Sequence, residues 1–438
     1  MANNMQNVAS AHLLGSSAKS PNQKTGRKPK AQTPIMAKKL RYALQRTAQS
    51  ELYDAESMRQ HRVCGCHRNI QSDGIPVFRT VDGSNARIAN VITCGSGWVC
   101  PVCNPKITEH RREDLYTAQV AWLKQGGSCQ LLTLTTEHEA DETIDTVLER
   151  ICKAQDLFTN HKFVKKTFGT ATATVMQREA KGNPVKEQIH GTHQRLGYVR
   201  SLEVTHGING WHPHFHIVMF MNDDELLTDG VTLQRLKEVW VECLIKSGAD
   251  KHKVNDMLRN ALDLRGGDYV SDYILKFGRE PINVNGWTIA HEVTKANSKM
   301  AARMIGGDWH YTPFQLLGFA TDGDIEAARL FKEFALAFTG KRMNYWTNGL
   351  KDYFGINDVE DDEIAQEETE PEAEEELVIY LNPNEWREIL KTNTRAELLE
   401  VAAAFGREGV IEFLEKLPDR QRTHSGHYTV NKPKGLWI

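Results

Sequence analysis

The sequence predicts an α+β fold in which an antiparallel sheet carries helices on one face, together with a small zinc-binding lobe and a helical C-terminal module. The sheet is predicted by residues 198–206 and 211–220, which are rich in β-branched and aromatic residues and flank the turn sequence GING. The lobe is predicted by five cysteines between positions 64 and 103, and the module by helical periodicity after residue 377.

Changes in composition along the 438 residues divide the chain into five segments. We expect a disordered basic arm, then a zinc-binding lobe with flanking helices, an α+β domain, an acidic linker, and a helical C-terminal module with a loose tail. The predicted boundaries are, in that order, 1–36, 37–125, 126–350, 351–376 and 377–438.

The distribution of charge indicates a polyanionic partner. Residues 1–50 contain nine Lys or Arg and no acid, whereas residues 358–376 contain twelve acids; removing these twelve from a chain of formal net charge −3 leaves +9. A basic body with a detachable acidic segment fits a polyanion partner. The alternative is that both segments are solvated, disordered regions. Under the first interpretation, one hypothesis is that the acidic linker competes with the polyanion for the basic surface.

The sequence also predicts a cytoplasmic protein without a membrane partner. No apolar run approaches the length of a membrane span, and the N-terminus lacks the apolar core of a secretion signal. In that compartment, clustered cysteines favour metal binding over disulfides.

A structural zinc site is predicted by the cysteine spacing. Cys100 and Cys103 form a C-x-x-C pair, the tight turn that lets two thiolates bind one tetrahedral Zn²⁺. A redox pair is the alternative, but the additional upstream cysteines and the absence of a βαβ pattern favour zinc. The ligands that we expect are Cys66, Cys94, Cys100 and Cys103, with Cys64 as an alternative and His67 as a reserve.

A second metal site is predicted on the hairpin 198–220. Successive side chains of a strand alternate between faces, which puts His212, His214 and His216 on one face. Folding the chain about its turn places Glu203 opposite His214. We expect His214, His216 and Glu203 to bind a divalent cation, Mg²⁺ or Mn²⁺ if the substrate is a phosphate, and His212 to lie outside the ligand set. Alternatively, the histidines have only structural hydrogen bonds.

A short helix with two tyrosines follows at 268–277, bounded by glycines on both sides. Tyr269, Tyr273 and Lys276 share one face of this helix at spacings of four and seven residues. A tyrosine stripe of this kind commonly packs into a core. Here the lysine on the same stripe, and a separate apolar face, favour a chemical role for the tyrosines.

These stretches resemble, in the same order, the motifs of rolling-circle replication initiators of the HUH endonuclease superfamily. The similar segments are 131–135 (LLTLT), 210–216 (GWHPHFH) and 269–276 (YVSDYILK), and the cysteine segment 94–103 looks like the zinc knuckle of bacterial plasmid initiators. The resemblance covers residues 60–280 approximately and implies a palm-like HUH domain, similar to the RRM fold.

The resemblance implies that the protein nicks single-stranded DNA at a plasmid replication origin. Tyr273 is implied as the primary nucleophile that forms a 5′-phosphotyrosine and frees a 3′-OH primer, Tyr269 as a second nucleophile that rejoins ends, and Lys276 as a stabilising cation. Related plasmid initiators often carry Glu at the position of Tyr269. A host DNA polymerase is an implied partner because it would extend the 3′-OH. A host helicase is also implied, because the sequence lacks a P-loop and unwinding must come from another protein. A homodimer is one option for the assembly of the chain.

Two alternatives stay open at this point. The same chemistry serves transposases and relaxases of mobile elements, although relaxases usually carry a three-histidine metal cluster. The other alternative is a non-enzymatic, zinc-dependent DNA-binding protein whose histidines are structural. Cleavage of single-stranded oligonucleotides with Mg²⁺ or Mn²⁺ distinguishes the enzymes from the binding protein.

Overall fold

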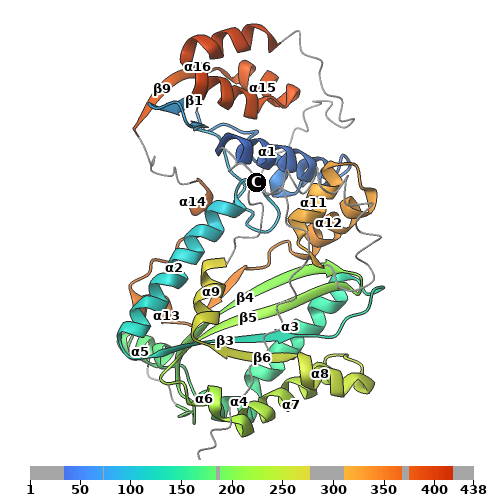
Figure 1. Ribbon diagram of the computed structural model, residues 1–438, viewed down its shortest axis with the longest axis vertical. Coiled ribbons are helices and arrows are strands. Elements are labelled where there is room, and N and C mark those ends of the chain that lie inside the picture. The colour runs from blue at the N-terminus through green and yellow to red at the C-terminus, as the bar shows by residue number, and fades with distance from the viewer. Residues whose placement is uncertain (1–33, 73, 184–187, 277–309, 367–373, 418–438) are drawn as a thin grey trace, which may run out of the picture.

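The computed structural model describes residues 34–72, 74–183, 188–276, 310–366 and 374–417 (Figure 1). The basic arm predicted at 1–36 therefore falls almost entirely outside the described residues, as does the tail after 417. Within the described part of the chain, no helix is both long enough and apolar enough to cross a bilayer.

The fold is α+β, as predicted, and its centre is a six-stranded antiparallel sheet (Figure 1). Its order is β6-β3-β5-β4-β7, with β8 also paired to β4. The strands are β3 (Ser128–Thr135), β4 (Arg195–Gly207), β5 (Gly210–Met221), β6 (Leu262–Gly266), β7 (His310–Tyr311) and β8 (Asn344–Trp346).

The β4–β5 hairpin is the longest pairing in this sheet, and its turn fixes its register. Gly207 pairs with Gly210 across a two-residue loop, which places Glu203 directly opposite His214. Gly210 has a φ of 84°, and a Cβ there would lie 2.7 Å from the carbonyl oxygen of Glu139. A side chain is therefore excluded at this position by both conformation and space.

Helices cover the sheet face that carries His214 and His216, called here the histidine face. Val199, Val218 and Phe220 point from this face into a buried cluster with the apolar residues of the covering helices. These helices are α2 (Asn104–Lys124), α5 (Thr172–Ala180), α9 (Asp268–Lys276) and α13 (Leu350–Phe354).

Helices also cover the opposite face, so the prediction that helices lie on one face only is wrong. Phe215, Ile217 and Leu134 belong to a second, larger core on that side. The cause is visible in the strands: Leu131 and Leu132 are adjacent and both buried, on opposite faces. The helices of this core include α3 (Ile144–Asn160), α7 (Gly230–Lys246), α11 (Pro313–Thr321) and α12 (Ile325–Ala337).

The other helices of the sheet domain are short. They connect the strands of the sheet to the longer helices, and some of the helices to one another. They are α4 (Lys162–Phe168), α6 (Glu225–Thr228), α8 (Val254–Asn260) and the 3₁₀ turn Lys251–Lys253.

A second, three-stranded sheet joins the cysteine lobe to the end of the chain. Its strands are β1 (Ile75–Thr80), β2 (Ala86–Ile88) and β9 (Glu375–Leu381), with β1 in the middle. The last helices, α15 (Pro383–Thr392) and α16 (Arg395–Glu415), pack on this sheet (Figure 1). The segment predicted as a separate C-terminal module thus shares a sheet and a core with residues 75–91.

The cysteine lobe also contains α1 (Pro34–Glu51) and the 3₁₀ turn Arg62–Gly65. Part of the segment predicted as an acidic linker is folded against it. Helix α14 (Asp361–Gln366) lies beside α2, and its Ile364 and Ala365 are buried. Residues 367–373 of that segment lie outside the described residues.

Candidate functional site

Two imidazoles and one carboxylate converge on the histidine face. His214 Nε2 lies 3.3 Å from Glu203 Oε2, and His216 Nε2 lies 3.5 Å from the same oxygen. The three side chains together offer ligand atoms that all lie within 4.8 Å of one another. A two-residue spacing on β5 and the cross-strand register of β4 produce this convergence directly.

The other ring nitrogens of the two histidines are held by hydrogen bonds. His216 Nδ1 lies 3.1 Å from Thr133 Oγ1 on the neighbouring strand β3, and His214 Nδ1 lies 3.4 Å from the carbonyl oxygen of His212. A ring N–H that donates to the carbonyl leaves the lone pair of His214 on Nε2. Metal-binding histidines are oriented in the same way, with the second nitrogen bonded to the protein.

The electrostatics of the group suit a cation. Burial lowers the pKa of His216 to about 4, despite the opposing charge of Glu203, so this imidazole is neutral at pH 7. Burial alone would raise the pKa of Glu203, but its contacts with His214 and His216 outweigh burial and lower it. Two imidazole nitrogens and one carboxylate oxygen are a donor set that fits a divalent cation.

Tyr273 lies against this group. Its hydroxyl lies 3.3 Å from Glu203 Oε1, and its ring centroid lies 4.8 Å from that of His216. Val270 and Ile274, both fully buried, anchor α9 to the histidine face. Burial, followed by the charge of Glu203, raises the pKa of the Tyr273 phenol well above its usual value.

Tyr269 has a different environment from Tyr273. Its side chain is 57% exposed, and the Arg265 guanidinium lies 4.7 Å from its ring centroid. Lys276 is the last residue of α9, and its side chain lies outside the described residues. Of the residues predicted on this helix face, the structure therefore brings Tyr273 to the histidines and leaves Tyr269 largely in solvent.

His138 and His212 form a pair beside the group of Glu203, His214 and His216, and of the two only His212 was expected near that group. His138 Nε2 lies 2.7 Å from His212 Nδ1, and His138 Nδ1 lies 2.6 Å from the carbonyl oxygen of Asn209. This chain of bonds ties the end of β3 to the turn of the hairpin. Burial, then the neighbouring His214, lowers the pKa of His212 to about 3. The sequence signal for this pair was the position of His138, three residues beyond the end of the buried strand β3.

Four cysteines form a second candidate metal centre. The Sγ atoms of Cys66 and Cys103 lie 3.7 Å apart, those of Cys94 and Cys103 3.7 Å, and those of Cys100 and Cys66 3.6 Å. Four sulfurs at ~2.3 Å from a tetrahedral Zn²⁺ are separated by ~3.8 Å, whereas a disulfide requires ~2.05 Å. Cys64 lies outside the cluster, with its sulfur 3.6 Å from the carbonyl oxygen of Gln49. The buried cluster could therefore hold zinc.

Polar side chains surround the cysteines, and no pattern in the sequence predicted them. Gln45 Nε2 lies 3.8 Å from Cys100 Sγ, and Arg395 of α16 donates to Gln45 Oε1 at 2.7 Å. Arg395 is 3% exposed and lies over the ring of Tyr42. A buried cation would offset the negative charge of four thiolates around one Zn²⁺.

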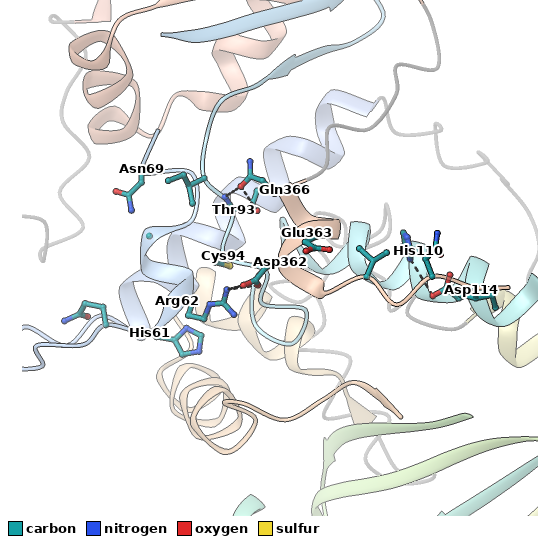
Figure 2. Close-up of a pocket in the computed structure, with 16 residues that line it drawn as sticks. His61, Arg62, Asn69, Thr93, Cys94, His110, Asp114, Asp362, Glu363 and Gln366 are labelled. Carbon is teal, nitrogen blue, oxygen red and sulfur yellow. Dashed lines mark hydrogen bonds and ion pairs between the residues drawn. The ribbon is translucent and has the colours of Figure 1, made fainter. Parts of the chain in front are cut away.

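A cavity of about 1140 Å³ borders the cysteine lobe at Cys94 (Figure 2), and its lining does not include Glu203, His214 or His216. Its lining carries side chains of both charge signs, and within it Arg62 Nη2 lies 2.6 Å from each carboxylate oxygen of Asp362. Two more acids near α14 contact basic residues: Asp361 lies 2.9 Å from Arg111, and Asp358 lies 2.7 Å from Lys351. This mixed lining does not form a catalytic constellation, and we assign the chemistry to the histidine face.

Comparisons with known proteins identify two relatives. The chain is 28% identical to a Streptomyces lividans protein named "Protein rep" over 337 residues, which are 67% of this chain and 70% of the relative. It is 30% identical over 153 residues to a Streptomyces cyanogenus "Neomycin resistance protein", 34% of each chain. No family model matches, and no solved structure matches. The predicted resemblance to Rep proteins is thus confirmed as a similarity to "Protein rep" over two thirds of the chain.

Proposed function

We propose that the chain is a plasmid replication protein that nicks single-stranded DNA at an origin, with Tyr273 as the nucleophile. The observation that supports this most directly is the contact of Tyr273 with the group formed by Glu203, His214 and His216. The Tyr273 phenol and the candidate metal site share the Glu203 carboxylate. An attacking oxygen and a phosphate-binding cation would therefore lie side by side. The similarity to "Protein rep" supports the same interpretation.

In the proposed reaction, the Tyr273 oxygen attacks a backbone phosphorus. The bond from phosphorus to the 3′-oxygen breaks, the 3′-oxygen leaves as a hydroxyl after taking a proton, and the 5′-phosphate stays on the tyrosine. The phenol must lose its proton, and Glu203 Oε1 is the acceptor that it faces at 3.3 Å. Burial raises the pKa of Tyr273, so the free phenol is a weak nucleophile.

A divalent cation held by Glu203, His214 and His216 would polarise the phosphate oxygens and stabilise the developing negative charge. For a phosphate substrate, Mg²⁺ or Mn²⁺ is the expected ion. We assign Zn²⁺ to Cys66, Cys94, Cys100 and Cys103, where its role is to hold the lobe together. The group Glu203, His214 and His216 contains a carboxylate, which argues against the three-histidine metal cluster that relaxases usually carry.

The second tyrosine is proposed to act at termination. Exchange of a phosphate between two tyrosine esters conserves the number and kind of bonds, so a second phenol can resolve the first covalent link. Tyr269 is exposed and lies one helical turn from Tyr273, where an incoming strand can reach it. Lys276, on the last turn of the same helix, is proposed to stabilise the phosphate.

The test is covalent trapping on a single-stranded origin oligonucleotide in Mn²⁺ or Mg²⁺. The wild-type chain should form a covalent adduct that denaturing gels resolve, and the double variant Tyr269→Phe, Tyr273→Phe should form none. His216→Ala should also form none while retaining its zinc. Equal adduct from the wild type and the double variant would exclude tyrosine chemistry and favour a non-enzymatic DNA-binding protein.

A further inference from the structure

We propose that His193, Asp223 and Glu225 form a second divalent-cation site, at the end of the β4–β5 hairpin that lies away from Glu203 and His214. The inference is independent of the proposed nicking chemistry. One ring nitrogen of His193 and one carboxylate oxygen from each acid lie within 4.8 Å of one another. His193 lies just before β4, Asp223 just after β5, and Glu225 opens α6.

The backbone holds these segments together before any ion binds. The His193 amide donates to the carbonyl oxygen of Thr167 at 2.8 Å, and the Asn222 amide donates to the carbonyl oxygen of Gln194 at 3.2 Å. Gln130 Nε2 donates to the carbonyl oxygen of Asp223 at 3.1 Å. The loop before β4 and the loop after β5 are thus fixed against each other, and the site needs little ordering to bind an ion.

The His193 imidazole has the burial and the hydrogen bonding that are typical of a metal-binding histidine. It is 7% exposed, and its Nε2 lies 3.1 Å from Asp229 Oδ2. Its Nδ1 is buried and has no hydrogen-bond partner in the described part of the chain. Because a buried nitrogen without a partner is costly, this lone pair indicates a missing ligand. Donation of the other N–H to a carboxylate is the usual arrangement around metal-bound histidines.

Asp229 is itself fixed, so it can orient His193. Its Oδ1 accepts the Thr232 amide at 2.9 Å, at the start of α7. Because a carboxylate oxygen accepts hydrogen bonds, the 3.1 Å contact with Asp229 Oδ2 favours the tautomer with its proton on Nε2, which leaves Nδ1 as the nitrogen for a cation.

Charge provides a further argument. Asp223, Asp224, Glu225 and Asp229 lie within seven consecutive positions, and no lysine or arginine among the described residues forms an ion pair with them. Asp223 Oδ1 accepts the Glu225 amide at 3.0 Å, so its second oxygen is available. A divalent cation would offset this concentration of negative charge.

The ligand set suggests the type of cation and its role. One imidazole and two carboxylates, with the acids exposed, suit Mn²⁺ or Zn²⁺ with water at the remaining positions. The run from His214 to Met221 on β5 covers roughly 24 Å at ~3.4 Å per residue. The site is therefore too far away to share a phosphate with Tyr273, and its expected role is to staple the loop before β4 to α6 and α7.

The test is a Mn²⁺ titration of the full-length protein that carries one Zn²⁺ per chain, at the four cysteines, followed by electron paramagnetic resonance. The background variant His214→Ala, His216→Ala removes the first cation group, so any tight Mn²⁺ that it binds must lie elsewhere. We expect one equivalent of bound Mn²⁺ in this background, and loss of that equivalent when Asp223→Asn and Glu225→Gln are added. Mn²⁺ should raise the melting temperature of the background but not that of the fourfold variant.

Controls keep the result interpretable. Asp141→Asn, an exposed acid elsewhere, should leave the equivalent in place. If the fourfold variant fails to fold, as judged by circular dichroism, His193→Gln in the same background replaces it and should also lose the ion. Equal Mn²⁺ stoichiometry in the background and in the variants of this cluster, or no bound Mn²⁺ in the background, would overturn the proposal.

Discussion

The Tyr273 hydroxyl and the His214 imidazole contact the same carboxylate, each at 3.3 Å: the phenol at Glu203 Oε1 and the imidazole Nε2 at Glu203 Oε2. One side chain on β4 thereby connects a helix on the histidine face with a strand of the sheet. A change at Glu203 should consequently disturb cation binding and the position of the phenol together, whereas changes at either partner should separate the two effects.

The two tyrosines should differ sharply when substituted one at a time. Tyr273→Phe should lower adduct formation by at least ~10³-fold, because the attacking oxygen is removed. Tyr269→Phe should keep most of the first cleavage, since Tyr269 is 57% exposed and lies against Arg265. Mass spectrometry of the trapped peptide should identify Tyr273; an adduct found only on Tyr269 would reverse the assignment.

Thr133 should matter for cation binding although it offers no ligand itself. Its hydroxyl lies 3.1 Å from His216 Nδ1, so Thr133→Val removes the group that orients this imidazole. We expect a ~10–100-fold weaker Mn²⁺ affinity, the range found when partners of metal-binding histidines are lost. Calorimetric titration would measure it.

The matched control for Thr133 is Thr135→Val on the same strand. Thr135 has the same shape, but its hydroxyl contacts the carbonyl oxygen of Asn260, at 3.4 Å. Its Mn²⁺ affinity should stay close to that of the wild type. A comparable loss in both variants would show that the strand itself, rather than the bond to His216, had been disturbed.

Cys64 and Cys94 should differ in their effect on zinc. Cys94→Ser should reduce zinc content and melt the lobe, because a structural zinc site contributes on the order of 10 kcal/mol. Cys64→Ser should retain one zinc per chain, because its sulfur lies outside the cluster. Elemental analysis and thermal melts with and without a chelator would measure both, and zinc loss in Cys64→Ser would contradict this ligand set.

Neutralising the acids near α14 should strengthen nonspecific DNA binding at low salt. Asp358, Asp361 and Asp362 pair with Lys351, Arg111 and Arg62, and the triple change to Asn removes these three ion pairs. Arg62 becomes available to phosphates, whereas Arg111 and Lys351 each keep an ion pair with Asp114, at 3.8 Å, and so regain part of their positive field. The gain should vanish as salt rises, since it rests on counterion release. Fluorescence anisotropy at several salt concentrations would test it.

The control for the acidic segment carries the same charge change at another place. Glu408, Glu412 and Glu415 lie on α16 and can be changed to Gln. If this variant gains as much affinity as the Asn variant, net charge alone explains the effect. Unchanged binding in the Asn variant would exclude competition between the acidic segment and DNA.

The sequence was most informative where contacts are local. The register of Glu203 and His214 follows from a two-residue turn only a few positions away, and the alternation of β5 puts both imidazoles on one side. The helix at 268–276 follows from its bounding glycines and its apolar spacing. Periodicity and turn chemistry are sufficient for such features because few conformations satisfy them.

Long-range features could not be read in the same way. Helices on both faces, the support of Cys100 by Gln45 and Arg395, and the approach of His193 to Asp223 each join segments that are far apart in the chain. Local patterns contain no information about which distant segment covers a face. The exposure of Tyr269 was missed for a related reason: a shared helix face does not fix how far each residue reaches into a site.

The pairing of β1 with β9 has a consequence for how the chain is made. Strand β1 begins at Ile75, but its partner β9 ends at Leu381, some 300 residues later. At ~5–20 residues per second, ribosomes take roughly 15–60 s to deliver that partner. Throughout this interval one edge of β1 is open to other polypeptides. Nonsense mutations upstream of Glu375 should therefore yield inclusion bodies and chaperone-bound chains rather than a shortened, working protein.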